Sequence, residues 1–520
     1  MFIRRIFIAL LCIFVSAFSF SGFQSVEASE EQSIRIGVVP SAESITLGSD
    51  HSFSITDKET GEILAQGTNN SAEVSLMSSG SVDTSYRLQV AWSTNTAYID
   101  DWLHRAEIGG YETYLEEHNG GYRLLIGKFP VEGSWSARVA FKNEMITNGL
   151  AASDAFWQIK TITTGTASLK VRFAGEERLT ENPVQIHSTD GIIEIGGKKY
   201  RGIGEVGYNS SGSLAGINEL PIEQYLYGVV PRELPPVPYG EIEAQKAQAV
   251  AARTYTLANL GKRSADGYDL LPTPSDQVYG GYDAEHPVST QAVQETEGMV
   301  ATHNGKLITA VYHSTSGGFT ANNEDIWSSD SVAYLRGVPD AERGNSMENV
   351  PSLDVFKNHA NAKSLRNSKN GDYESDWSKY HRWEYEWTNE EISEVLSEYF
   401  ATEVGNVQEI NVVNRSDSGR VLEIEFVTDN GTFYEYKDKI RWSLKYFNAS
   451  GGKSVLLSTL FFIEPMKSKG EFTGFKAYGG GWGHGVGLSQ TGAVGMATKG
   501  DSYETILKHY YQDIALEKKY

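Results

Sequence analysis

The sequence of 520 residues has a single cysteine, Cys12, and it lies near the N-terminus. Once that segment is removed, the chain has no disulfide, no thiol nucleophile and no cysteine ligand for a metal. Basic residues are also scarce, since 45 Lys and Arg stand against 67 Asp and Glu, giving a formal net charge of −22. This is the wrong sign for a surface that follows phosphates, so we expect no nucleic-acid partner.

Proline and low-complexity sequence are rare too. The chain has 14 prolines, with 40% hydrophobic, 22% charged and 11% aromatic residues. This composition is typical of an ordered globular protein, and the length allows about three domains. The aromatic residues suit stacking on the C–H faces of sugars, but core packing is their more general use.

Long hydrophobic runs are absent except at the N-terminus. Arg4 and Arg5 precede an apolar run from Ile6 to about Phe20, and small residues follow up to Ala28. This pattern predicts a secretory signal peptide over residues 1–28. The alternative is an uncleaved membrane anchor, for which the run is near the short end of the ~17–25 residues required. Either interpretation predicts that the rest of the chain is exported.

The pattern after the leader predicts an α+β architecture that is rich in strands and carries one inserted module. Residues 29–84 show short alternating strands. Residues 85–162 contain two related runs, YRLQVAWS and YRLLIGKF, and two helical segments, which predict a small β-α-β-β-α unit with its helices on one side.

Residues 168–520 begin with further strands up to Pro221. The expected elements that follow are a helix at IEQYLYGVV, a buried Ala-rich helix after Gly240, a strand at LITAVY, a polar surface loop over residues 343–377, a helix opened by the capping box Thr388 and Glu391, strands from 407 to 463, and a C-terminal helix at SYETILKHYYQD.

Several familiar catalytic signatures are missing. The chain has no HExxH motif and no P-loop lysine. In the glycine-rich stretch Gly479–Gly487, GxGxxG fails at Leu488. GxSxG fails there at Thr491, and we expect no strand leading sharply into a helix at Ser489. These absences argue against a metal enzyme, an NTPase or a serine hydrolase, and we expect no metal and no cofactor.

Glu233 is the strongest candidate for chemistry, because it lies between Pro231 and Pro235 at the end of an apolar helix. Apolar neighbours would raise its pKa toward the value that a general acid needs near neutral pH. The alternative is a helix-terminal glutamate in a surface salt bridge.

Two further segments gather polar residues and glycines. HSTSGG, residues 313–318, follows the predicted strand and brings an imidazole and short hydroxyls to a strand end, where ligand contacts are common. Gly479–Gly487 has six glycines in nine residues, which allow positive φ angles and close approach. A hydrogen-bonded turn and a tightly packed turn, respectively, are the alternatives.

At these same residues the chain resembles the SpoIID/LytB family of bacterial cell-wall proteins. The similarity runs through NELPIEQYLYGVVPRELP, AQKAQAVAARTYTLAN, DQVYGGY, HSTSGG, NNEDIW, YLRGVPD and GWGHGVGLSQTGAVGMATKG. It extends over residues 168–520, and the inserted module is similar to a SPOR-type module, which in other proteins recognises glycan without stem peptides.

The resemblance implies lytic transglycosylase activity on peptidoglycan glycan strands, with Glu233 as the catalytic acid/base. It predicts a secreted, wall-associated protein, or one anchored to the outer face of the cytoplasmic membrane if the leader is retained. The family also implies an alternative, a non-catalytic protein that enhances a cell-wall amidase and so has that amidase as its partner.

The resemblance also carries over a set of residues expected to line or build the site. Lys246 and Arg253 lie seven residues apart on one helix face, so they would bind acidic sugar substituents or pair with carboxylates; for Arg253 we favour pairing. Thr491 stands where the family often has tyrosine. The full set of expected substrate-binding residues is Arg232, Lys246, Gln248, Arg253, Tyr279, His313, Ser314, Ser316, Gly317, His484, Ser489 and Gln490.

Overall fold

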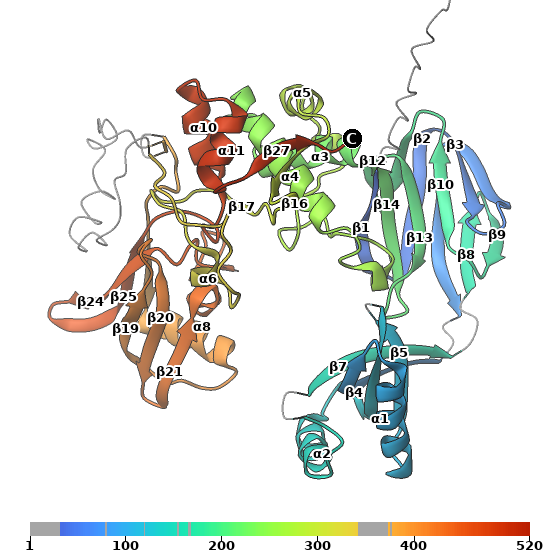
Figure 1. Ribbon diagram of the computed structural model, residues 1–520, viewed down its shortest axis with the longest axis horizontal. Coiled ribbons are helices and arrows are strands. Elements are labelled where there is room, and N and C mark those ends of the chain that lie inside the picture. The colour runs from blue at the N-terminus through green and yellow to red at the C-terminus, as the bar shows by residue number, and fades with distance from the viewer. Residues whose placement is uncertain are drawn as a thin grey trace, which may run out of the picture.

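The computed structural model describes residues 32–78, 81–118, 120–152, 155–164, 168–341, 373–374 and 377–520 (Figure 1). The predicted leader, residues 1–28, lies outside these ranges, as does most of the predicted loop 343–377. Several sheets and helices alternate along the chain, so the strand-rich α+β class is confirmed. Within the described ranges, no helix is both long enough and apolar enough to cross a membrane.

The largest sheet has ten strands and forms one end of the molecule (Figure 1). Its path is β1-β14-β13-β10-β2-β3-β8-β9, with the hairpin β11-β12 beside β2. The strands are β1 (Ser33–Ala42), β2 (Ser44–Asp57), β3 (Ile63–Ser78), β8 (Ser168–Phe173), β9 (Glu176–Thr180), β10 (Val184–Ser188), β11 (Ile192–Ile195), β12 (Lys198–Arg201), β13 (Ile203–Tyr208) and β14 (Leu214–Pro221). Alternating apolar residues of β1 and β2 are buried in its core. The sheet joins residues 33–78 to residues 168–221, so two segments predicted as separate parts form one sheet.

The inserted module consists of a smaller sheet and two helices, and it lies below the large sheet in the view of Figure 1. Its elements are β4 (Ser81–Ser93), α1 (Thr96–Ile108), β5 (Thr113–His118), β6 (Gly121–Pro130), α2 (Trp135–Thr147) and β7 (Phe156–Thr164), with sheet order β5-β6-β4-β7. Ile99 of α1 and Met145 of α2 join one apolar core with Leu88 and Leu124, so both helices cover the same face. The module enters after β3 and leaves before β8, which pair with each other, so the large sheet stays continuous.

A helical centre follows, arranged around the Ala-rich helix α4 (Ile242–Ala258). It packs against α3 (Ile222–Glu233), α5 (Pro287–Glu295), α10 (Gln490–Thr498), α11 (Tyr503–Tyr510) and β15 (Met299–His303). Small side chains such as Ala244, Ala247 and Ala251 are fully buried, so they let several elements approach one helix closely. The prediction of a buried Ala-rich helix is confirmed. Strands β16 (Lys306–Leu307) and β27 (Ala515–Lys518) flank β15.

The remaining lobe contains small sheets around the buried Trp387. Its elements are α6 (Asn323–Ile326), β18 (Trp383–Thr388), α8 (Asn389–Phe400), β19 (Val407–Arg415), β20 (Val421–Thr428), β21 (Gly431–Tyr436), α9 (Ile440–Ser443), β22 (Tyr446–Phe447), β23 (Lys453–Ser454), β24 (Phe461–Ser468) and β25 (Glu471–Gly479). The predicted capping box is confirmed, because the Glu391 N–H donates to Thr388 Oγ1 and the Thr388 N–H donates to Glu391 Oε2.

Candidate active site

Glu233 is the last residue of α3, whereas the predicted helix IEQYLYGVV ended at Val230. The helix continues through Pro231, so the predicted helix end was too early. Leu234 then ends the helix with its N–H on the Val230 carbonyl, and the Leu234 carbonyl accepts from Gln245 Nε2 of α4 at 2.8 Å. The backbone around Glu233 is therefore held between two packed helices.

Glu233 is half-buried as a residue, and hydrogen-bond donors surround its carboxyl group. The Val278 N–H donates to its Oε1 at 2.6 Å, and Tyr312 and Gln490 also hydrogen-bond to the carboxyl. Burial raises the pKa of Glu233 to about 7, while these bonds and the charge of Arg232 lower it by less. Among the described residues no ion pair includes Glu233, so the salt-bridge alternative has no support.

This raised pKa makes stability depend on pH. In the unfolded chain the carboxyl ionises near its ordinary value of 4.5, whereas the folded protein holds the proton until about pH 7. Folding stability is therefore lost as pH rises from 4.5 to 7. Glu233→Gln removes that loss, so we expect the variant to be more stable than the native protein by up to about 3 kcal/mol at pH 8. Urea unfolding at pH 8 and pH 4.5 measures this, and an equal difference at both pH values would contradict it.

Two short strands bring the distant motifs together beside Glu233. Strand β17 (Tyr312–His313) pairs in parallel with β26 (Leu488–Ser489), and the Thr491 N–H continues the contact to the Ser314 carbonyl at 3.0 Å. Of the predicted strand LITAVY, only Leu307 lies in β16 and only Tyr312 in β17. The Val311 carbonyl between them accepts from the Tyr511 hydroxyl at 2.7 Å and from the Leu488 N–H at 3.3 Å. The pairing places Gln490 next to the catalytic candidate.

The expectation that no strand leads into a helix at Ser489 was wrong. Strand β26 passes directly into α10, and Ser489 is the N-cap of that helix. Its buried hydroxyl accepts from the Gly492 N–H at 3.2 Å. Ser489 therefore serves as a helix cap, which is a structural use of its hydroxyl.

Gln490 and Gln248 form a side-chain pair behind the carboxyl. Gln490 Nε2 donates to Gln248 Oε1 at 3.2 Å, and the Gln248 side chain is fully buried. Gln248 Nε2 has no hydrogen-bond partner within the described part of the chain. The hydrogen bond to Gln248 therefore holds the Gln490 side chain where it also contacts the Glu233 carboxyl.

His313 and His484 lie together, with ring centroids 5.6 Å apart. The His313 Nδ1 pairs with the Val486 carbonyl, and the His484 Nδ1 accepts from the Val486 N–H, both at 3.1 Å. Burial lowers the pKa of His484 to about 3 and that of His313 well below its usual range. Both rings are therefore neutral near pH 7, which leaves Glu233 as the group able to exchange a proton there.

Two buried carboxylates, those of Asp340 and Glu374, hold the HSTSGG turn in place by hydrogen bonds. Ser316 Oγ donates to Asp340 at 2.6 Å, and the Gly317 N–H donates to Glu374 at 2.7 Å. Gly317 has φ +80, and a Cβ there would lie 2.8 Å from the Gly480 backbone. Thr491 Oγ1 donates to the same Glu374 at 2.7 Å, so this departure from the family pattern has a structural partner.

Other predicted residues have structural partners. Arg253 is buried and forms a two-pronged ion pair with Glu223, as favoured from the sequence. The ammonium of Lys246 pairs with two carboxylates, on Glu243 and Glu295, at 2.8 and 2.7 Å.

Tyr279 is buried as well, and its hydroxyl donates to Asn218 Oδ1 at 2.9 Å. Arg232 is exposed, with its stem against Gly280. As contacts to substrate, these residues stay predictions.

Sequence reasoning missed Tyr312 and Val278, which both contact the Glu233 carboxyl. Their positions carried a signal, since Tyr312 directly precedes HSTSGG and Val278 lies in DQVYGGY. It also missed Gln277, whose Oε1 lies 2.9 Å from the Tyr312 hydroxyl and shares the single proton of that hydroxyl with the Glu233 carboxyl.

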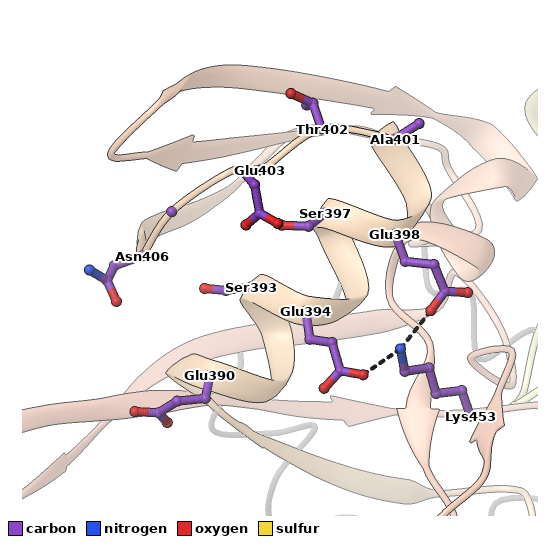
Figure 2. Close-up of a pocket in the computed structure, with 11 residues that line it drawn as sticks. Glu390, Ser393, Glu394, Ser397, Glu398, Ala401, Thr402, Glu403, Asn406 and Lys453 are labelled. Atoms are coloured by element: carbon purple, nitrogen blue, oxygen red, sulfur yellow. Dashed lines mark hydrogen bonds and ion pairs between the residues drawn. The ribbon is translucent and has the colours of Figure 1, made fainter.

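A separate pocket lies on α8, in the lobe remote in sequence from Glu233 (Figure 2). Four of its eleven lining residues are glutamates, and Lys453 Nζ pairs there with Glu394 at 2.7 Å and with Glu398 at 2.5 Å. None of the predicted site residues lines it. The predicted site residues therefore lie outside this pocket.

Comparison with known proteins covers this same region. Residues 210–303, which include Glu233, match the family described as Stage II sporulation protein, SpoIID. The chain is 32% identical over 313 residues to a Bacillus subtilis protein called Amidase enhancer, and 27% and 25% identical over 334 and 316 residues to Stage II sporulation protein D of Bacillus amyloliquefaciens and of Bacillus subtilis. Over this region the chain is similar to SpoIID proteins and to the amidase enhancer.

These matches cover only part of the chain. They span 56–58% of the chain, and they span 40% of the amidase enhancer against 76% and 74% of the two sporulation proteins. Residues 321–487, which contain the second lobe and His484, match a domain family of unknown function, DUF8618. The SPOR-like nature of the insert stays a prediction.

Some members of the SpoIID/LytB family are thought to hold a metal through cysteine and histidine near HSTSGG. Here the only cysteine is Cys12, far from that turn in sequence. Across the described ranges, no group of three His, Cys, Asp or Glu side chains is arranged to hold a metal ion. His313 and His484 alone do not fit such a site.

Proposed function

We propose that this protein is an exported cell-wall enzyme that cleaves peptidoglycan glycan strands as a lytic transglycosylase. The observation that carries this proposal is the position of the half-buried Glu233 at the end of α3, where the Val278 N–H donates to its carboxyl and burial raises the pKa to about 7. Such a group is about half protonated at neutral pH, so it serves as both acid and base.

In this reaction Glu233 first donates its proton to the glycosidic oxygen between MurNAc and GlcNAc, and the bond from that oxygen to C1 of MurNAc breaks. The resulting carboxylate then takes the proton of the muramic 6-hydroxyl while that oxygen bonds to C1. The product has a 1,6-anhydro end, and Glu233 regains its proton. Val278, Tyr312 and Gln490 would stabilise the carboxylate between the two steps.

A single carboxyl suffices for this route, whereas ordinary glycosidases need two. Asp276, two residues before Val278, uses its carboxylate in ion pairs with Lys262 and Arg263. Burial opposes its ionisation, but hydrogen bonds from Lys262, at 2.5 Å, and from Arg263 lower its pKa. Its environment therefore supports the transglycosylase over a hydrolase.

The inserted module is proposed to bind the same glycan, preferentially where stem peptides are absent. Its sheet carries the exposed aromatic residues Trp92 on β4 and Phe156 on β7, which suit contact with sugar rings. This supports a wall-binding role for the module beside cleavage at Glu233.

Mass spectrometry of the products tests the proposed activity. The protein without the predicted leader, residues 29–520, is incubated with amidase-treated glycan strands. We expect fragments with 1,6-anhydro ends. Hydrated reducing ends would instead identify a hydrolase, and intact strands would remove the proposal of catalysis.

The similarity to a protein called Amidase enhancer supports a second candidate function. In that case the protein would bind the wall and stimulate an N-acetylmuramoyl-L-alanine amidase without cleaving glycan. Intact strands, together with faster release of stem peptides when an amidase is added, would favour this candidate.

Tyr312→Phe tests the hydrogen bond to Glu233. Because the Tyr312 hydroxyl lowers the pKa of the Glu233 carboxyl, its loss should raise that pKa. We expect the alkaline limb of the pH–rate profile to move up by about 1 unit. The control is Tyr511→Phe, whose hydroxyl donates to the Val311 carbonyl. A limb that stays in place or moves down would contradict the role of Tyr312.

A further inference from the structure

Four aromatic side chains outside the predicted site gather into one surface. They come from the loop after α3, the segment before β18 and the glycine-rich loop. The aromatic surface consists of Tyr239, Trp377, Tyr380 and Trp482. Ring centroids are 5.6 Å apart for Tyr239 and Trp377, and 4.5 Å apart for Tyr380 and Trp482. The two pairs are linked through the chain, because Trp377 of one and Tyr380 of the other are only three residues apart in the segment before β18.

This surface connects to Glu233 at both of its ends. Tyr239 follows Glu233 by six residues, and its carbonyl accepts from Gln245 Nε2, which also binds the Leu234 carbonyl. At the other end, Trp482 pairs through its backbone with Thr315. Thr315 follows Ser314, whose carbonyl accepts from the Thr491 N–H beside Gln490. The aromatic rings therefore continue the same site.

The chain holds Trp482 firmly while leaving its side chain in solvent. Gly481 has φ +81, and a Cβ there would lie 2.7 Å from the Thr315 carbonyl oxygen. The Gly481 N–H also donates to the Tyr380 carbonyl at 2.8 Å. Even so, Trp482 and Trp377 each remain 41% exposed. A rigid group of aromatic rings facing solvent is typical of a binding surface.

We propose that the aromatic surface binds the pyranose rings of the glycan next to the bond that Glu233 cleaves. One face of a pyranose presents C–H groups, so stacking on an indole buries apolar area on both partners while the sugar hydroxyls stay in water. Sugar rings also follow one another at regular spacing along a strand, which suits two aromatic pairs in succession. The position of this subsite relative to the cleaved bond rests on the proposed function, whereas sugar binding by the surface does not.

Oxidative footprinting tests the proposal with a control inside the same molecule. The Glu233→Gln variant of residues 29–520 is treated with N-bromosuccinimide, with and without an N-acetylglucosamine hexamer, and oxidation of each tryptophan is measured by peptide mapping. Trp442 on α9 is also 41% exposed and is the matched control. With the hexamer at ten times its Kd, we expect oxidation of Trp377 and Trp482 to slow about 10-fold and that of Trp442 to stay unchanged.

Equal protection of all three tryptophans, or of none, would overturn the proposal. So would slow oxidation of Trp377 and Trp482 in the free protein, because another part of the chain or a second copy would then cover the surface. Protection by a proline-rich peptide but not by the hexamer would assign the surface to a protein partner and also overturn it.

Kinetics separate this inference from the proposed function. Trp377→Ala and Trp482→Ala should each raise the KM for peptide-free strands about 3- to 10-fold, with kcat nearly unchanged. Trp482→Phe should keep most of the affinity, and Trp442→Ala should match the native protein. If strands are cleaved but KM does not change in either alanine variant, the inference fails and the function stands. If no cleavage occurs yet the footprint appears, the sugar surface stands and the transglycosylase fails.

Discussion

Glu233→Gln is expected to lower the rate of glycan cleavage by roughly 100- to 10,000-fold, the usual contribution of a general acid and base. Glutamine has nearly the same shape and accepts the Val278 N–H in the same way, but it carries no proton that it can give to the glycosidic oxygen. The release of 1,6-anhydro fragments from amidase-treated strands, followed by mass spectrometry, measures the loss.

Glu241→Gln is the matched control, since Glu241 is exposed just before α4 and only eight residues further along the chain. This variant should cleave at the native rate. If Glu233→Gln retained more than about a tenth of the native rate, Glu233 would not be the acid, because a tenfold loss is only about 1.4 kcal/mol of barrier. Urea unfolding of Glu233→Gln, proposed above, also tests whether this variant is folded.

Arg253→Met is expected to cause the largest loss of stability, about 3–5 kcal/mol, because it leaves the Glu223 carboxylate buried without its ion-pair partner. Arg253 donates from Nε and from a terminal nitrogen to the two Glu223 oxygens, at 2.6 and 2.7 Å. It also donates to the Met299 carbonyl, so it connects α4 to α3 and to the start of β15. Urea unfolding at pH 7 measures the change in free energy.

Two further variants isolate the cause. The double variant Arg253→Met, Glu223→Gln should recover part of the loss, because no unpaired charge then stays buried. Arg172→Met removes an exposed pair with Glu177 and should cost less than about 1 kcal/mol. If Arg253→Met cost no more than Arg172→Met, Arg253 would not be part of the structural framework, and its predicted contact with substrate would regain support.

Local patterns predicted the elements that depend on neighbours in sequence. The capping box at Thr388 and the Ala-rich helix α4 are examples, because a capping box spans four consecutive residues and a helix repeats within four. The same patterns failed to predict that a strand leads into a helix at Ser489. Its strand β26 has only two residues and exists because β17 lies beside it, so no periodic signal precedes α10.

The sequence by itself indicated a strand-rich α+β chain, a resemblance to the SpoIID/LytB family and Glu233 as the strongest candidate for an acid/base. Only the tertiary structure decided what surrounds that carboxyl. Tyr312, Val278 and Gln490 come from separate segments, and the parallel pairing of residues 312–313 with 488–489 brings two of them together. Burial, which raises the pKa of Glu233 to about 7, is likewise the sum of contacts from all these segments. Such contacts form between residues that are distant in sequence, so no local pattern encodes them.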